Sequence, residues 1–472
     1  MNEHSARQHH TVTLAILAIG ALAFALAQTT VIPALTAMQH EFGVSTSDIT
    51  WMISGYFLAA SIATPVLGRL GDMFGKERFL AISLAAFALG SVVCALSNGL
   101  ELMILGRVLQ GIGGGVFPLS FGIVRDEFPI SKIPTGIALL GATAGIGGAI
   151  GLPLGGLLVD QASYHWIFWM SAAMGAVATV TTIRYVPESP VRTPGKVDIV
   201  GGVILALGLS AVLIAVSQAN QWGWTSDKTL GLVGIGLVIL AGFVRYELRH
   251  AAPLVNIRTL RRPAVLMTDV ATLLVGFGLF GTFILIPQIA ELPTGGDVGL
   301  GLNATQAGLL MAPGGLMMLL AAPIVGRVSE RIGSKLPLAV GAFLAAVGLL
   351  GMALAHDSAL LIVLWGMILN VGIGCAFAAL PNLVISAVEP HETGEATGVN
   401  MIARNVGAAL GGQVAASIVA GHVVAGGAPA NQGFELAFLM SAGVALLAGI
   451  VGLMIPVVRS GERAEARVLA VR

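Results

Sequence analysis

The residues best suited to chemistry begin with two matching segments. Residues 65–75 read PVLGRLGDMFG, and residues 323–333 read PIVGRVSERIG. Glycine permits tight turns and close helix approach, and the carboxylate in each copy can cap a helix end or pair with a cation. We predict two short, sharply turning loops; a merely solvated loop is the alternative, and the second copy argues against it. The candidate residues are Gly68, Asp72, Gly75, Lys76, Arg78, Gly326, Glu330 and Gly333.

Arg107 stands inside an apolar run, in the sequence GRVLQGIGGG of residues 106–115. A guanidinium at membrane depth costs several kcal/mol unless it faces a cavity or a partner, so such residues are usually functional. Snorkelling to the near interface is the alternative. Asp269 is the only carboxylate clearly inside an apolar run, and it could instead anchor a helix end. Because a carboxylate can carry a proton and arginine cannot release one, Arg107 and Asp269 are our candidates for proton coupling, with Asp126 and Glu395 as further carboxylates.

Residues 141–156, GATAGIGGAIGLPLGG, combine many small residues with a proline. This composition predicts a kinked helix that packs closely against its neighbours. A hinge or gate formed by Gly151, Pro153, Gly155 and Gly156 is the functional interpretation, and small-residue packing alone would also explain the sequence.

Several further polar residues lie inside apolar runs. Such residues either line a cavity or make hydrogen bonds between helices, and their types alone do not separate the two roles. The cavity candidates are Gln28, Thr29, Tyr56, Gln110, Asn370, Asn400 and Arg404.

The elements that must position these residues are membrane helices. The 472-residue chain is 56% hydrophobic and only 10% charged, whereas soluble domains carry about 25% charged residues. Each apolar run approaches or exceeds the roughly 20 residues that cross a bilayer, and only a helix satisfies its own backbone in hydrocarbon. We predict fourteen spans, at 11–33, 49–69, 79–97, 102–124, 135–158, 164–186, 198–218, 230–248, 265–288, 304–326, 336–355, 359–384, 394–419 and 435–457.

Basic residues predict how the chain is oriented. Most of the 24 Lys and Arg residues lie at the N-terminus, in the even-numbered loops and in the C-terminal tail. Cytoplasmic loops carry the excess of basic residues, so we expect both termini in the cytoplasm and a multi-pass protein of the cell (inner) membrane. The weakest loop is 385–393, which has no Lys or Arg.

The internal repeat predicts an all-α fold of two six-helix bundles. We expect one bundle in residues 1–197, two inserted helices in 198–262, and the other bundle with a short cytoplasmic tail in 263–472. Parallel repeats of this kind are one way in which transporters build alternating access.

Other function classes find no support in the sequence. A phosphate-binding loop and a nucleophile-base arrangement are both missing, which argues against ATP-driven transport by this chain and against an enzyme. Cys94 and Cys375 lack metal-site spacing, so we expect no metal and no cofactor. Zero formal net charge gives no attraction to nucleic acid.

These residues carry a family resemblance. Residues 68–78 resemble the loop signature of the major facilitator superfamily, and residues 107–111 (RVLQG) resemble its fourth-helix signature. The run ending at Gly156 resembles the fifth-helix signature of its antiporters. The span count and the segments 197–202 and 396–407 are similar to the fourteen-helix drug:proton antiporter branch.

The resemblance implies a proton-driven exporter with a cavity between its two halves. It implies that Asp72 and nearby basic residues stabilise one conformation, that Arg107 takes part in proton coupling, and that the fifth-helix glycines shape a gate. The chain departs from the family pattern at Ala27, where the family has Asp, at Glu77, where a basic residue is usual, and at Leu152, because the proline is displaced by one position. The missing acid leaves the proton site open.

The sequence therefore predicts a secondary transporter that exports hydrophobic or amphipathic molecules, such as drugs, antibiotics or dyes, in exchange for protons. Its partners would be a lipophilic substrate, protons and membrane lipid, and we expect a monomer. The alternatives are an exporter of one endogenous metabolite and a non-transporting receptor or assembly factor.

Overall fold

The computed structural model describes residues 3–44, 46–49, 51–129, 132–189, 198–250, 253–388, 393–424 and 429–456. Within these ranges the fold is all-α, and the only β interaction is an isolated bridge between Val423 and Pro429. The expected bundle limit at residue 197 lies outside the described residues.

Fourteen helical segments correspond to the fourteen predicted spans. One of them is interrupted: α6, the 3-10 turn η1 and α7 follow each other in the span Leu100–Glu127. The long segments are α1 (Glu3–Thr29), α4 (Trp51–Phe74), α5 (Lys76–Ala95), α6 (Leu100–Gly111) with η1 (Ile112–Gly115) and α7 (Val116–Glu127), α8 (Ile133–Gln161), α9 (His165–Tyr185), α10 (Ile199–Trp222), α11 (Asp227–Glu247), α13 (Pro263–Glu291), α14 (Ala304–Ile332), α15 (Lys335–Leu354), α16 (Ala359–Ala387), α17 (Thr393–Ala420) and α18 (Asn431–Met454). The short helices are α2 (Leu35–Phe42), α3 (Thr46–Ile49) and α12 (Ile257–Leu260).

Thirteen of the described segments are long and apolar enough to cross a membrane by length and composition. The remaining predicted span is α17, which has the length of its neighbours with 28 residues. Its lower hydropathy has a clear cause in four polar side chains, Asn400, Arg404, Asn405 and Gln413. Helix α17 packs along α13 and α4, so it lies inside the helical assembly.

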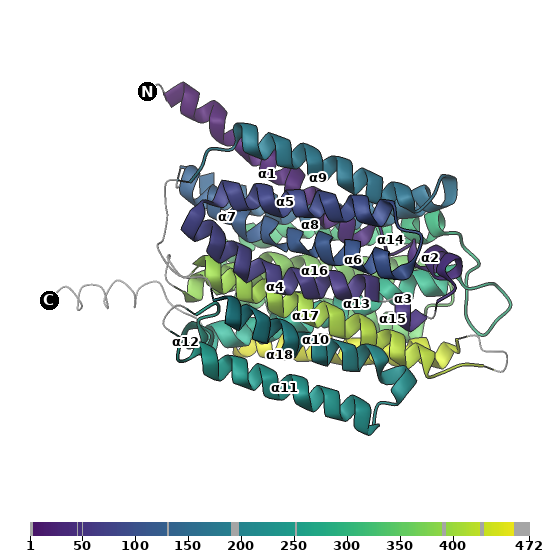
Figure 1. Ribbon diagram of the computed structural model, residues 1–472. Helices are drawn as coiled ribbons and strands as arrows, with labels where there is room; N and C mark the ends of the chain where they lie inside the picture. The colour runs from purple at the N-terminus through teal and green to yellow at the C-terminus, as the bar shows by residue number, and fades with distance from the viewer. Residues whose placement is uncertain are drawn as a thin grey trace.

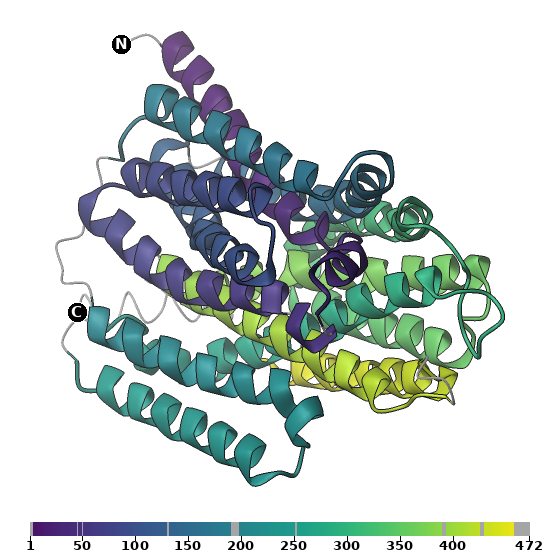
Figure 2. The same cartoon turned by 45° about the vertical axis from the view of Figure 1, so that its right-hand side comes forward.

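The helices form two bundles with an outlying pair (Figures 1 and 2). Helices α1 and α4–α9 make the first bundle, and α13–α18 make the second. The bundles meet chiefly where α8 packs on α14 and where α4 packs on α17. The inserted helices α10 and α11 lie at one edge, with α10 against α4 and α17 and α11 on the outside.

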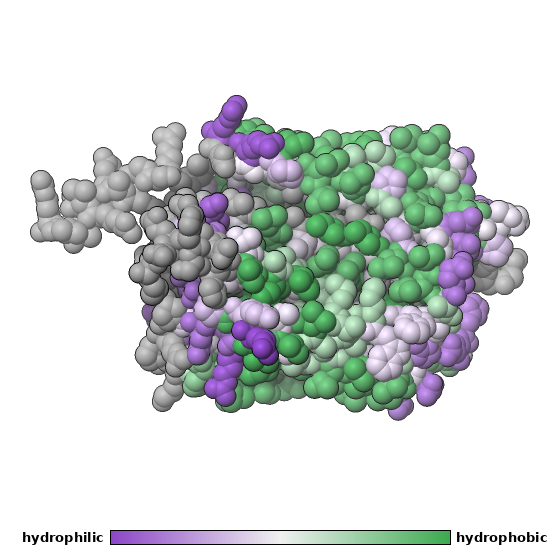
Figure 3. All heavy atoms as spheres, turned by 90° about the horizontal axis from the view of Figure 1, so that it is seen from above, coloured by the Kyte–Doolittle hydropathy of each residue, from purple (hydrophilic) through white to green (hydrophobic). Residues whose placement is uncertain are grey.

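The surface fits a bilayer. Figure 3 shows hydrophobic residues over the middle of one face and hydrophilic residues gathered towards its two ends. Large apolar side chains stand exposed on many helices, among them Leu89 on α5, Val180 on α9 and Val238 on α11. Since hydrocarbon solvates such side chains, the chain is a multi-pass membrane protein.

The two predicted loops are wrong as loops. Helix α4 continues through Phe74, and the chain turns at Gly75 alone, whose φ is +117°. In the second copy α14 continues to Ile332 and turns at Gly333, with φ of +81°. Glycine inside a helix costs only about 1 kcal/mol, so the earlier glycines do not stop either helix. A single glycine at positive φ suffices for the turn.

Candidate functional site

Arg107 is fully enclosed by the first bundle. Its side chain is 1% exposed, so it does not snorkel to the interface. Nε donates to the carbonyl oxygen of Met52 at 3.1 Å, and Nη1 donates to that of Ala27 at 3.1 Å. Nη1 also donates to Oε1 of Gln110 at 2.8 Å. Arg107 thereby connects the end of α1 and the start of α4 to α6.

Tyr56 and Ser91 complete this arrangement. The Arg107 guanidinium lies 4.3 Å from the centroid of the buried Tyr56 ring, a favourable cation–π contact. On the other side, Nε2 of Gln110 donates to Oγ of Ser91 at 2.7 Å. Glycine at position 90 allows α5 and α6 to approach closely enough for this bond. A methyl group added there would lie only 2.6 Å from the Gly106 carbonyl oxygen.

At position 27, where the family pattern has an aspartate, Arg107 binds a backbone carbonyl oxygen. Ala27 stands where the family pattern has Asp, and its carbonyl oxygen accepts from Arg107. Among the described residues, the hydrogen-bond acceptors of Arg107 are all neutral groups. Its charge is therefore solvated by dipoles and by an aromatic ring, without an ion pair.

Asp269 forms a separate cluster in the second bundle. Its side chain is 6% exposed, and its Oδ1 accepts from Nδ2 of Asn400 at 2.7 Å. The same Nδ2 also lies 2.7 Å from Oγ1 of Thr272. Oδ2 of Asp269 is buried with no hydrogen-bond partner among the described residues. One side of this carboxylate is thus held in place while the other is left unsatisfied.

The two candidates for proton coupling do not meet. Arg107 touches the end of α1 and the start of α4, whereas Asp269 lies two turns into α13. With antiparallel neighbours along the chain, these positions belong to opposite ends of the molecule and to different bundles (Figure 1). A direct Arg107–Asp269 pair is therefore excluded in this conformation.

Arg404 lies where the bundles face each other. Its Cζ is 5.4 Å from the centroid of the Phe377 ring, and the guanidinium is near enough to Tyr56, in the other bundle, for its charge to act on the hydroxyl. The Tyr56 hydroxyl donates to the carbonyl oxygen of Phe24 on α1 at 3.5 Å, and Gln28 of the same helix lies near it. Gln28 and Arg404 are partly accessible, whereas Tyr56 is buried. The structure thus gathers four of the cavity candidates, Gln28, Tyr56, Arg404 and, through Arg107, Gln110.

The fifth-helix glycines sit at close contacts of α8. Added methyl groups would meet the Thr29 side chain at Gly151, the Thr30 carbonyl oxygen at Gly155 and the Ala304 carbonyl oxygen at Gly156. The first two contacts hold α8 against α1, and the third joins the bundles. Across the same interface, a methyl group on Gly308 would lie 2.8 Å from Cα of Pro153.

Two hydrogen bonds between Asp160 and Thr305 connect the bundles at this end of the interface. Oδ2 of Asp160, at the end of α8, accepts from the backbone N of Thr305 at 2.8 Å and from its Oγ1 at 2.6 Å. No sequence feature indicated this contact, because Asp160 resembles any other carboxylate at the end of a span. In the described conformation the halves are joined at the end where α1 finishes.

Asp72 belongs to an ion-pair cluster at the opposite end. The buried Lys76 ammonium lies 3.1 Å from Oδ1 of Asp72 and 2.7 Å from Oδ2 of Asp126. Oδ2 of Asp126 also accepts from Ser189 at 2.8 Å. Arg78 is exposed beside Glu77. Sequence reasoning did not identify Asp126 as the main partner of Lys76, because the two lie on α7 and α5.

The remaining candidates are less connected. An added methyl group on Gly326 would meet nothing within 4 Å, and the side chain of Glu330 lies outside the described part of the chain. Asn370 donates to the carbonyl oxygen of Gly366 on its own helix at 2.8 Å. It faces a small pocket between α13, α14 and α16.

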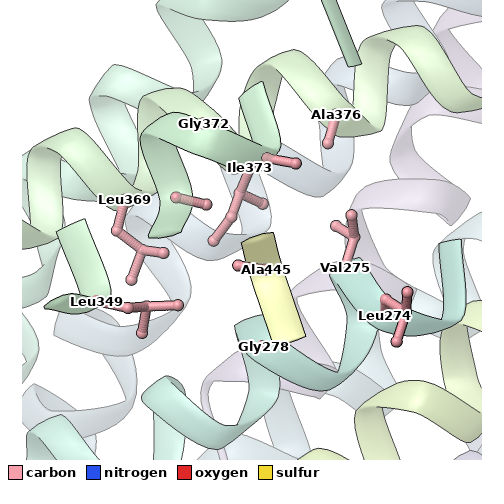
Figure 4. Close-up of a pocket in the computed structure, with 11 residues that line it drawn as sticks. Leu274, Val275, Gly278, Leu349, Leu369, Gly372, Ile373, Ala376 and Ala445 are labelled. Atoms are coloured by element: carbon pink, nitrogen blue, oxygen red, sulfur yellow. The ribbon is translucent and has the colours of Figure 1, made fainter. Parts of the chain in front are cut away.

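An apolar pocket also lies inside the second bundle. Figure 4 shows side chains of α13, α15, α16 and α18 turned towards it. Its lining includes Leu274, Val275, Leu349, Leu369 and Ile373. Because it lies within one bundle and offers no polar side chain, it is a packing gap and not the expected cavity between the halves.

Comparison with known proteins agrees with this architecture. The family model described as Major Facilitator Superfamily matches residues 17–412. The chain is 29% identical over 415 residues to the "Tetracenomycin C resistance and export protein" of Streptomyces glaucescens, covering 87% of this chain and 76% of that protein. It is 29% identical over 378 residues to the "Multidrug resistance protein B homolog" of Mycobacterium tuberculosis (strain ATCC 25618 / H37Rv), covering 79% and 69%.

A solved structure supports the same fold. The human organic anion transporter MFSD10 (TETRAN) superposes with a TM-score of 0.67, covering 94% of this chain and 99% of that chain. The two sequences are only 16% identical, so the likeness concerns the fold alone.

Proposed function

The chain belongs to the Major Facilitator Superfamily, a family of non-enzymatic transporters, and from this premise we propose that it exports hydrophobic or amphipathic small molecules in exchange for protons. Drugs, antibiotics and dyes are the proposed substrates. The names of two relatives, one for tetracenomycin C resistance and export and one for multidrug resistance, support export from the cell. We also propose that both termini face the cytoplasm of a cell (inner) membrane, which a C-terminal reporter active only in the cytoplasm would test.

The observation that carries the proposal is the contact between α8 and α14. Gly156 and Gly308 bring the backbones of the two bundles together, and the Asp160–Thr305 hydrogen bonds lock that end. Alternating access requires one bundle to rock against the other around a central site. An interface of glycine–backbone contacts can close tightly and can separate without unpacking large side chains.

A bulky residue at Gly156 tests this interface. Overpacking costs about 1–3 kcal/mol, and such a penalty shifts a conformational equilibrium roughly 5- to 150-fold. We expect Gly156→Leu to reduce efflux of a panel of anionic, neutral and cationic dyes and antibiotics in an efflux-deficient host. Gly141→Leu on the same helix is the matched control, because Gly141 is exposed with nothing within 4 Å of an added methyl group.

The outcomes of that experiment are distinct. Retained efflux by Gly156→Leu, at equal membrane abundance, would remove this interface from the transport cycle. A wild-type protein that lowers accumulation of no compound in the panel would contradict export altogether.

For proton coupling we propose Asp269 as the proton carrier. The support is its buried, unsatisfied Oδ2 and its Asn400 partner on α17, a helix that lines the bundle interface. Arg107 cannot release its proton, so it would tune the field and not carry the proton. In proteoliposomes with an imposed pH gradient, wild type should concentrate a transported dye and Asp269→Asn should not. Uphill transport by Asp269→Asn would place the proton site elsewhere, and a wild type that ignores the gradient would contradict antiport.

A further inference from the structure

We propose that the transported molecule is an organic anion whose carboxylate or phenolate binds the Arg404 guanidinium beside Tyr56. This inference rests on the proposed export function and names the class of substrate that the site would take.

The position of Arg404 is unusual. It is residue 12 of the 28 in α17, so it stands near the middle of the membrane. Among the described membrane helices, with α6, η1 and α7 counted as one span, it is the only charged residue in the middle third. A charge at that depth costs several kcal/mol unless a partner or a water-filled space receives it.

The protein supplies Arg404 with no anion. Within the described ranges of the chain, its guanidinium has an aromatic contact with Phe377 and lies near Tyr56, and it has no ion pair or hydrogen bond. Asn400, one helical turn earlier, binds Asp269, but that carboxylate makes no ion pair with Arg404. Five N–H donors are therefore available to an incoming acceptor.

A second positive charge stands behind the same site. The Tyr56 ring lies 4.3 Å from the Arg107 guanidinium, and the charges of both arginines act on its hydroxyl. Since the acceptors of Arg107 are neutral, its charge is not cancelled by an ion pair. The charges of the two guanidinium groups favour an anion over a cation beside them.

The surroundings suit an aromatic or amphipathic body. The Phe377 ring faces Arg404, and Phe24 stacks on Tyr56 with ring centroids 5.5 Å apart. Gln28 adds an amide and is partly accessible, as Arg404 and Phe377 are. A guanidinium pairs well with a planar carboxylate, and the partly accessible Phe377 ring can pack against the apolar remainder of the molecule.

The test uses purified full-length protein and two dyes. Fluorescein is an anionic xanthene dye, and rhodamine 6G is a cationic dye with the same ring system. Equilibrium binding and proteoliposome transport of both are measured for wild type, Arg404→Gln, Arg404→Lys and Arg184→Gln. Arg184 is exposed on α9 and serves as the matched control, and thermal unfolding shows whether each variant is folded.

We expect wild type and Arg184→Gln to bind fluorescein more tightly than rhodamine 6G. Arg404→Gln should weaken fluorescein binding by about tenfold or more, as expected for a lost charge-assisted hydrogen bond, without weakening rhodamine 6G. Arg404→Lys should lie between the two. Undiminished fluorescein binding by Arg404→Gln, a preference of wild type for rhodamine 6G, or no fluorescein binding by wild type would overturn the inference.

The proposed export function fails separately. Transport of rhodamine 6G without fluorescein would contradict the anionic substrate and leave export intact. If the protein transports neither dye and no compound of the efflux panel, the export function itself is contradicted, and the inference falls with it.

Discussion

The two bundles treat buried charge in opposite ways. In the first bundle, Arg107 has acceptors on three helices and an aromatic face. In the second bundle, Asp269 keeps one oxygen without a partner and Arg404 has only aromatic and electrostatic contacts within the described residues. A fully satisfied buried polar network rigidifies its surroundings, and a partly satisfied one is costly.

This difference suggests that the buried charge of the first bundle serves stability and that the buried charges of the second bundle serve transport. The Arg107 network connects α1, α4 and α6, so we expect it to hold one half rigid. Asp269 on α13 keeps one carboxylate oxygen without a partner, and Arg404 on α17 keeps N–H donors without acceptors among the described residues. We expect these two groups to act where the halves move against each other. We therefore expect stability to depend on the first bundle's network and transport to depend on the second bundle's groups.

The largest effect should follow from Arg107→Ala. The change leaves Gln110 and the carbonyl oxygens of Ala27 and Met52 without their donor. Each buried unsatisfied group costs about 1–3 kcal/mol, so we expect a loss of several kcal/mol in unfolding free energy. Thermal unfolding in detergent measures it. An unfolding temperature within a degree of wild type would abolish the contrast between the bundles.

An intermediate effect is expected for Asp72→Asn. Asp72 is 35% exposed at its side chain, and Lys76 retains its shorter pair with Asp126. A partly exposed ion pair contributes up to about 1 kcal/mol, which corresponds to a roughly fivefold change in a conformational equilibrium. Dye efflux should fall by up to that factor while membrane abundance is retained.

Asp126→Asn sharpens that measurement. Its carboxylate is 5% exposed and also accepts from Ser189, so its loss should reduce efflux more than the loss of Asp72. Equal or smaller damage from Asp126→Asn would mean that the cluster does not stabilise a conformation through Lys76.

The smallest change in stability should follow from Asp269→Asn. Oδ1 would still accept from Asn400. The new amide N–H donors would lack an acceptor, but the free-energy cost of burying a charge would be removed, and the two effects offset each other. We expect the unfolding free energy to stay within about 1 kcal/mol of wild type, although transport is lost. A destabilisation as large as that of Arg107→Ala would make Asp269 a structural residue and remove it as a proton carrier.

The sequence by itself determined the helices and the types of residue available. The length of the apolar runs predicts the spans because, in hydrocarbon, a helix supplies hydrogen-bond partners for its own backbone N–H and C=O groups. The fourteen predicted segments all contain helix. The depth of Arg404 and the presence of Asp269 follow from the same pattern. The two local errors, at residues 68–74 and 326–332, arise because glycines favour a loop in the sequence although a helix tolerates them.

Only the tertiary structure decided which partners these residues have. Arg107 binds a carbonyl oxygen at Ala27, and a backbone acceptor leaves no trace in residue type. Asp269 and Asn400 are 131 residues apart and meet because α13 packs along α17. Asp160 meets Thr305, 145 residues away, at the contact between the bundles. Interhelical packing sets such pairs, and hydrophobic periodicity along one helix specifies which residues are buried without specifying which helix covers them.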